Sequence, residues 1–175
     1  MAKTRTQSFA HLNVDPAAIT LADAAAWVME QHKKGAVCPC CGQLAKRYKR
    51  KLNSSMAYAL LLISRYFRTH SEWLHVPEYL EQVCTAGPTK RGGDWAKLVH
   101  WGLIVAKDDE TRADGSRRIG FYKMTPKGMD FVQGRIRVPR YAYLYAQKCI
   151  AMSPEDTSIS EALGDRFDYG ELMSS

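Results

Sequence analysis

The chain has 175 residues, of which 46% are hydrophobic and 25% are charged, and its formal net charge is +7 at neutral pH. This length suits one domain with additions, and the apolar content is enough for a packed core. No apolar run approaches the roughly 20 residues that a transmembrane helix needs, so we expect no membrane span. The N-terminus lacks the long apolar centre of a secretory signal, so we do not expect export.

The charge is distributed unevenly along the sequence. Residues 153–175 contain six acidic residues and one basic residue and so carry −5, which leaves +12 on the rest of the chain. A body this basic suggests a polyanionic partner, most often nucleic acid, although such a charge also serves solubility. The acidic tail could fold back over the basic face and mask it, and we keep this as a hypothesis.

Two helices are predicted in the first part of the chain. Thr20 is a suitable N-cap for a helix over 20–34, and Asn53 is a suitable N-cap for a longer helix over 53–69. Apolar residues recur in both segments at the helical period. Because the second segment is apolar on nearly all sides before its first arginine, we expect it to be the central buried helix.

Three of the five cysteines are crowded into the segment VCPCCG between these helices. Cys38 and Cys41 form a Cys-x-x-Cys-Gly knuckle, a tight turn in which two thiolates can converge on one zinc ion. The knuckle supplies only half of a tetrahedral site. We therefore expect zinc as a cofactor, with its remaining ligands drawn from Cys40, His70 and His75, or from His32.

Two other interpretations of the cysteine segment stay open. It is also compatible with a degenerate zinc ribbon whose cysteines pack as small apolar residues. A redox-active pair is the third interpretation, although no alternating strand and helix pattern surrounds it. The odd number of cysteines does not indicate a disulfide framework and fits the reducing cytoplasm, where we expect the protein to be.

The basic run KRYKRK follows the cysteine segment. Each phosphate that a basic side chain neutralises releases counterions, so such a run favours salt-dependent binding to DNA. A solvated linker and a nuclear-localisation sequence are the alternatives. The candidates for contacts with DNA phosphates are Lys46, Arg47, Lys49 and Arg50.

Helices and strands alternate after the second helix. A short helix begins near Pro77, and WAKLVHW forms another amphipathic helix. Two strands within 103–124 follow, joined by a turn at an Asp-Gly pair. Thr125, which precedes a proline, then caps a further helix.

The C-terminal part combines a predicted strand with short helices. Tyrosine alternates with alanine or leucine over 141–145, which indicates a strand with its tyrosines on one face. Such a face more often packs in a sheet or a dimer than stacks on bases. Ser153-Pro154 and the capping box from Ser158 to Glu161 are each expected to start a short helix.

The order of helices and hairpin over about 53–134 resembles the winged helix-turn-helix domains of MarR- and PadR-like regulators. These run from a leucine-bearing recognition helix through Gly-Leu-Ile and a wing to a Tyr-x-x-Thr-x-x-Gly junction. The resemblance covers under half of the chain and implies DNA binding, transcriptional control and a homodimer. The matching residues are Leu98, Gly102, Leu103, Ile104, Tyr122, Thr125 and Gly128.

The expected fold is therefore α+β and mostly α. It comprises a winged helix-turn-helix, an N-terminal helix with a cysteine knuckle, and a C-terminal extension of strand and helix. The domains are 1–52 (arm, helix, knuckle and basic segment), 53–134 (winged helix) and 135–175 (extension with the acidic tail).

Within this fold, Trp95 and Leu98 face inward, which turns a polar and basic side of the recognition helix toward the major groove. The candidates for reading DNA on this helix are Lys90, Arg91 and Lys97. Two adjacent glycines weaken its first turn by about 1 kcal/mol each. The candidates for phosphate contacts in the wing are Arg112, Arg117 and Arg118.

The sequence thus predicts a non-enzymatic protein that binds double-stranded DNA and regulates transcription. We find no nucleophile with a base and no phosphate-binding glycine loop. The alternative is a protein-interaction adaptor or inhibitor built on the same scaffold. It would contact a protein partner through the acidic tail or through the face of Tyr141, Tyr143 and Tyr145.

Overall fold

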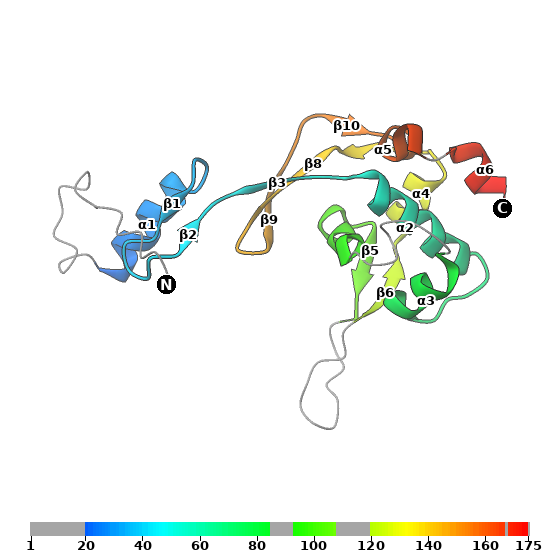
Figure 1. Cartoon of the computed structure of the whole chain (residues 1–175), viewed down its shortest axis with the longest axis horizontal. Helices are drawn as coiled ribbons and strands as arrows, with labels where there is room; N and C mark the ends of the chain where they lie inside the picture. Colours follow the sequence, from blue (N-terminus) through cyan, green and yellow to red (C-terminus); the bar gives the residue numbers. More distant parts are fainter. Residues whose placement is uncertain (1–19, 85–92, 108–119, 167, 175) are drawn as a thin grey trace, which may run out of the picture. The chain divides into compact units, whose positions relative to one another are not determined.

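A computed structural model of the chain describes residues 20–84, 93–107, 120–166 and 168–174 (Figure 1). The chain divides into two units. We call Met1–Tyr48 with Leu144–Gln147 the N-terminal unit, and Lys49–Tyr143 with Lys148–Ser175 the C-terminal unit.

The described residues of the N-terminal unit include a helix and a short hairpin. Helix α1 (Leu21–Gln31) begins with the expected cap, because the Thr20 side chain accepts from the Asp23 N–H and Asp23 reaches back to the Thr20 backbone. Strands β1 (Ala36–Val37) and β2 (Leu44–Ala45) then pair antiparallel. The VCPCCG segment forms the turn between these two strands.

Helix α2 (Ser54–Tyr66) is the centre of the C-terminal unit, and Figure 1 shows other helices gathered around it. The Asn53 side chain accepts from the Met56 N–H at 2.9 Å, which confirms the predicted cap. The helix packs against four other helices of the unit. Its buried residues confirm that it is central: Met56, Ala57, Ala59, Leu60, Leu61, Leu62, Ile63 and Ser64.

The C-terminal unit contains a three-stranded antiparallel sheet. Strand β4 (Leu74–His75) leads into helix α3 (Val76–Val83), and the 3-10 helix η2 (Gly93–Trp101) leads into β5 (Ile104–Ala106). Strand β6 (Phe121–Met124) lies between the other two, so the sheet order is β4-β6-β5. The two predicted hairpin strands are thus confirmed, whereas the predicted Asp-Gly turn lies outside the described residues.

Thr125 connects β6 to helix α4 (Pro126–Val132) through its side chain. Its hydroxyl accepts from the Gly128 N–H at 2.9 Å and donates to the Gly102 carbonyl at 2.7 Å. The first bond is the predicted helix cap. The second ties the start of α4 to the end of η2, so this junction positions the sheet against both helices.

Four strands follow α4: β7 (Val138–Pro139), β8 (Tyr141–Tyr145), β9 (Lys148–Met152) and β10 (Asp156–Thr157). Strand β10 pairs with β7. Strand β3 (Tyr48–Lys51) joins β8 and β9 in a sheet of order β3-β8-β9. The expected strand over 141–145 is confirmed, since Ala142 and Leu144 are buried between half-buried tyrosines.

The helix predicted at Ser153-Pro154 is wrong. The Ser153 N–H donates to the Tyr141 carbonyl at 2.9 Å, and the Ser153 hydroxyl donates to the Glu155 carbonyl at 2.8 Å. These bonds hold residues 153–155 in a bend that leads into β10. Serine can satisfy neighbouring backbone groups in a turn as well as at a helix cap, and here the pairing with β7 decides between the two.

The acidic C-terminal segment belongs to the core of its unit. Ser158 and Glu161 form the predicted capping box of helix α5 (Ile159–Leu163), which packs on α2. After the short helix η3 (Gly164–Arg166) comes α6 (Tyr169–Ser174), where the Tyr169 hydroxyl donates to the Val132 carbonyl at 2.7 Å. Burial of Ile159 and Leu163 makes this segment structural.

The expectation of a mostly helical fold is wrong. The structure is mixed, with 45% helix and 24% strand, and its described residues form four small sheets. Five of the strands have only two residues, which is too short to produce an alternating pattern in the sequence. None of the helices among the described residues is long and apolar enough to cross a membrane.

Candidate nucleic-acid interface

Helix η2 has the inward stripe that the sequence predicts. Trp95, Leu98 and Trp101 are buried, and the Trp101 indole N–H donates to the Pro139 carbonyl at 2.6 Å. Asp94 is exposed on the other side, where its carboxylate forms an ion pair with Lys97. Lys97 is therefore part of an intramolecular pair.

Lys90 and Arg91, the other candidates on this helix, lie outside the described residues. His100 near the end of η2 is half-buried. Burial, assisted by the positive charge of Lys97, lowers the pKa of His100 below its usual value. The imidazole therefore stays neutral at neutral pH and adds no positive charge to η2.

Two lysines surround an indole ring at one end of the β4-β6-β5 sheet. The Nζ of Lys123, on β6, lies 5.1 Å from the centroid of the Trp73 ring, and the Nζ of Lys107 lies 5.8 Å from it. Cations are attracted to the face of an indole, so the ring holds both lysines at this end of the sheet. We call Trp73, Lys107 and Lys123 the wing root.

The wing root lies where the described chain breaks off before the predicted wing. Lys107 immediately precedes segment 108–119, which contains the predicted phosphate-binding residues. These three arginines, Arg112, Arg117 and Arg118, lie outside the described residues. The wing root is thus the nearest described basic cluster in sequence to them.

A second basic cluster lies on the β3-β8-β9 sheet. The Nζ of Lys49 lies 3.8 Å from the centroid of the Tyr141 ring, and the guanidinium of Arg140 lies 5.8 Å from the same centroid. Lys49 and Arg50 are both exposed. Because they are neighbours in a strand, they point to opposite faces of the sheet.

The remaining basic candidates belong to the N-terminal unit. Lys46 is exposed, and the Arg47 N–H donates to the His32 carbonyl at 2.8 Å. The run KRYKRK therefore continues into a strand, and its four candidate residues are divided between the two units. No single patch can be assigned to them.

The turn of the β1-β2 hairpin has the geometry of a cysteine knuckle. The Gly42 N–H donates to the Cys38 carbonyl at 2.9 Å, and Gly42 has a positive φ of 70°. Hydrogen bonding from the backbone N–H of Cys41, with a smaller effect from that of Cys40, holds the pKa of the Cys38 thiol below its usual value. Cys38, Cys40 and Cys41 are all free thiols.

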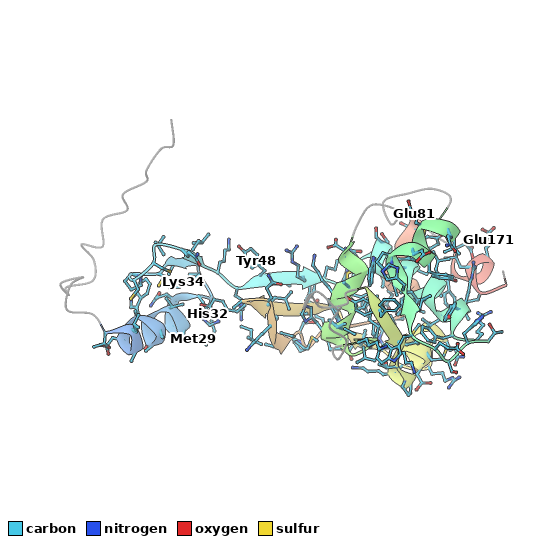
Figure 2. All side chains as sticks on the ribbon, turned by 90° about the horizontal axis from the view of Figure 1, so that it is seen from below. Met29, His32, Lys34, Tyr48, Glu81 and Glu171 are labelled. Carbon is cyan, nitrogen blue, oxygen red and sulfur yellow. The ribbon has the colours of Figure 1, made fainter. Side chains whose placement is uncertain are left out.

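The three predicted histidine ligands each have other contacts within their own unit. His32 belongs to the same unit as the knuckle but is buried, with its Nδ1–H donating to the Met29 carbonyl at 2.6 Å (Figure 2). His70 stacks on Tyr66, and His75 lies beside Glu78. In the described ranges, no three His, Cys, Asp or Glu side chains are grouped so that they could hold one metal ion.

Among its described residues, the acidic tail forms an ion pair with Arg137 through Glu161. Arg137 donates to both carboxylate oxygens of Glu161, at 2.7 and 2.9 Å. The bond with Arg137 holds the pKa of Glu161 below its usual value, and a hydrogen bond from the Ser158 backbone N–H adds a smaller effect in the same direction.

No family model, no curated protein and no solved structure matches the chain. Its function has to be inferred from its own residues.

Sequence reasoning missed the wing root and the basic cluster of Lys49 and Arg140 beside Tyr141. Trp73 and Lys123 are 50 positions apart in the sequence, and only the pairing of β4 with β6 brings them together. Lys49 and Tyr141 meet through the pairing of β3 with β8. The lysine that follows two aromatic residues in FYKM is the local signal that could have indicated Lys123.

Proposed function

We propose that the C-terminal unit is a winged helix-turn-helix and that the protein binds double-stranded DNA with it as a transcriptional regulator. The order α2, β4, α3, η2, β5, β6 and the sheet order β4-β6-β5 support this proposal. In such a domain, η2 occupies the position of the recognition helix, and segment 108–119 occupies the position of the wing.

The wing root is the observation that carries the proposal. Lys107 directly follows β5, Lys123 lies on the neighbouring strand β6, and both ammonium groups lie near one indole ring, so two positive charges lie close to the predicted wing. The segment that follows Lys107 has three arginines. A row of basic groups of this kind suits consecutive phosphates of one DNA strand.

The two predicted groups of DNA contacts then have different tasks. Arg112, Arg117 and Arg118 would bind phosphates together with the wing root. Lys90 and Arg91 would reach the major groove from the N-terminal side of η2. Lys97 would contribute less than the sequence suggests, because Asp94 neutralises it.

Charge neutralisation at the wing root tests this function. In Lys107→Gln/Lys123→Gln, each lost phosphate contact should reduce the slope of log affinity against log salt by about 0.9. Fluorescence anisotropy with a labelled random duplex measures the slope. Lys33→Gln/Lys34→Gln, which removes the same charge from exposed positions of the N-terminal unit, is the matched control and should retain more of the slope.

Equal slopes in the two double variants would show that the wing root does not bind phosphate. The thermal unfolding of each variant is measured alongside, because loss of the Trp73 contacts also affects stability.

We further propose a homodimer and a cytoplasmic location, the latter from the cysteine content of the sequence.

A protein-interaction adaptor or inhibitor is the second candidate. The tyrosine strand β8 supports it, since its three tyrosines are half-buried and the neighbouring strand β9 exposes Ile150. Aromatic and apolar side chains on one sheet are typical of protein contacts. Salt-insensitive capture of a protein partner, lost in Ile150→Lys, with no duplex binding would favour this candidate.

A further inference from the structure

The N-terminal unit is small and has little apolar core. Among its described residues, only four side chains are buried: Ala24, Val28, His32 and Leu144. Units with so little buried surface usually need a disulfide bond, a metal ion or a partner chain for stability. The cysteines of this unit are free, so no disulfide supplies that stability.

The β1-β2 hairpin has two residues in each strand and would be marginally stable alone. Its turn is nevertheless closely defined. The Cys38 N–H donates to the Gln43 carbonyl at 2.8 Å, and the Gly42 N–H donates to the Cys38 carbonyl at 2.9 Å.

These two bonds close the chain from Cys38 to Gln43 into the tight turn of a cysteine knuckle. Cys41 follows at the spacing that lets a second sulfur reach the same ion, and it is exposed. The knuckle can therefore present two thiolates toward solvent.

The described residues offer no third ligand, whereas a structural zinc site needs four. A second copy of the chain carries an identical pair of thiols. A two-fold axis through the metal ion would place the two pairs around it, and closed two-fold symmetry is the commonest form of association between identical chains. We propose that one zinc ion joins two copies of this protein through Cys38 and Cys41 of each.

Zinc binding of this kind involves no redox change. Four thiols release four protons to solvent, and four Zn–S bonds form, so the centre carries a net charge of −2. Basic residues adjoin the hairpin on both sides, which offsets this charge. They are Lys33, Lys34, Lys46 and Arg47.

The stoichiometry of zinc and the mass of the full-length protein test this inference. The protein is purified under reducing conditions without chelator, its metal content is measured by mass spectrometry, and its mass by light scattering. One zinc ion per two chains is expected, with twice the chain mass of 19.8 kDa. A chelator should convert the dimer to monomer, and zinc, but not magnesium, should restore it.

Cysteine variants identify the ligands. Cys38→Ser and Cys41→Ser should lose both the zinc and the dimer, whereas Cys40→Ser and Cys149→Ser, which also remove exposed thiols, should keep both. X-ray absorption of the wild-type zinc protein should give four sulfur ligands at about 2.3 Å. This spectrum and the chelator experiment decide the question even if a ligand variant fails to fold.

Three results would overturn the inference. One zinc ion per monomeric chain would mean that the site is completed within one chain. Absence of zinc from a zinc-supplemented preparation would remove the site, and a dimer that persists without zinc would separate association from the metal. None of these results depends on DNA, so the inference can fail while the proposed DNA binding stands, and the reverse also holds.

Discussion

Gly128 packs so closely on Leu103 that a Cβ at residue 128 would overlap the Leu103 carbonyl oxygen and lie 2.6 Å from the sulfur of Met124. This contact brings α4 against the chain between η2 and β5. Gly128→Ala should therefore lower the free energy of unfolding by about 1–3 kcal/mol, because the Leu103 backbone and helix α4 must move apart to make room for the methyl group. Urea denaturation measures the change.

Gln133→Ala is the control for this substitution. Gln133 is exposed at the end of the same helix, and its loss should change the free energy of unfolding by no more than about 0.5 kcal/mol. If the urea midpoint of Gly128→Ala equals that of the wild type, α4 does not approach Leu103 as closely as described.

Thr125 is expected to be as important as Gly128 at this junction. Thr125→Ala removes the cap on the Gly128 N–H and the bond to the Gly102 carbonyl, so it should cost about 1–2 kcal/mol. Thr125→Ser keeps the hydroxyl and should retain most of the stability. Thermal unfolding of both variants tests whether the hydroxyl, and not the methyl group, makes the contribution.

Local signals in the sequence were sufficient for most of the helices. Asn53, Thr125 and Ser158 each precede a helix whose N-terminal N–H they cap, and caps act within three residues. The burial of α2 followed from its apolar composition on nearly all sides.

The strands were harder to predict because their pairing is not local. Strand β10 exists through its pairing with β7, and Ser153 therefore begins a bend between β9 and β10 where the sequence suggested a helix. The same reason applies to the candidate site. The contacts of Lys123 with Trp73 and of Lys49 with Tyr141 both depend on sheet pairing between distant segments.

The C-terminal segment should be required for folding. Leu163→Ala should lower the free energy of unfolding by about 2–5 kcal/mol, because Leu163 is buried in the core around α2. Removal of 153–175 should unfold the C-terminal unit, which circular dichroism would detect. Glu155→Gln, at an exposed position, should leave stability nearly unchanged. A folded truncated protein with higher DNA affinity would instead support masking by the tail.

The pairing of Glu161 with Arg137 should make stability depend on pH in the acid range. The bond with Arg137 lowers the pKa of Glu161 in the folded protein, so the stabilisation is complete above the unfolded value of 4.5. It is lost as the pH falls through the folded value, because the unfolded chain then binds the proton more readily. Urea midpoints from about pH 6 to about pH 3 should fall more steeply in wild type than in Glu161→Gln. Parallel curves would show that the pair contributes nothing.

Binding of the full-length protein to DNA at two salt concentrations tests the central claim most directly. Anisotropy of a labelled random duplex should show binding at about 10 µM protein in about 50 mM salt, and the affinity should fall at least tenfold in about 200 mM salt. Substitution of the wing root should flatten this dependence. Absence of binding at the lower salt concentration, or an affinity that does not change with salt, would contradict the account.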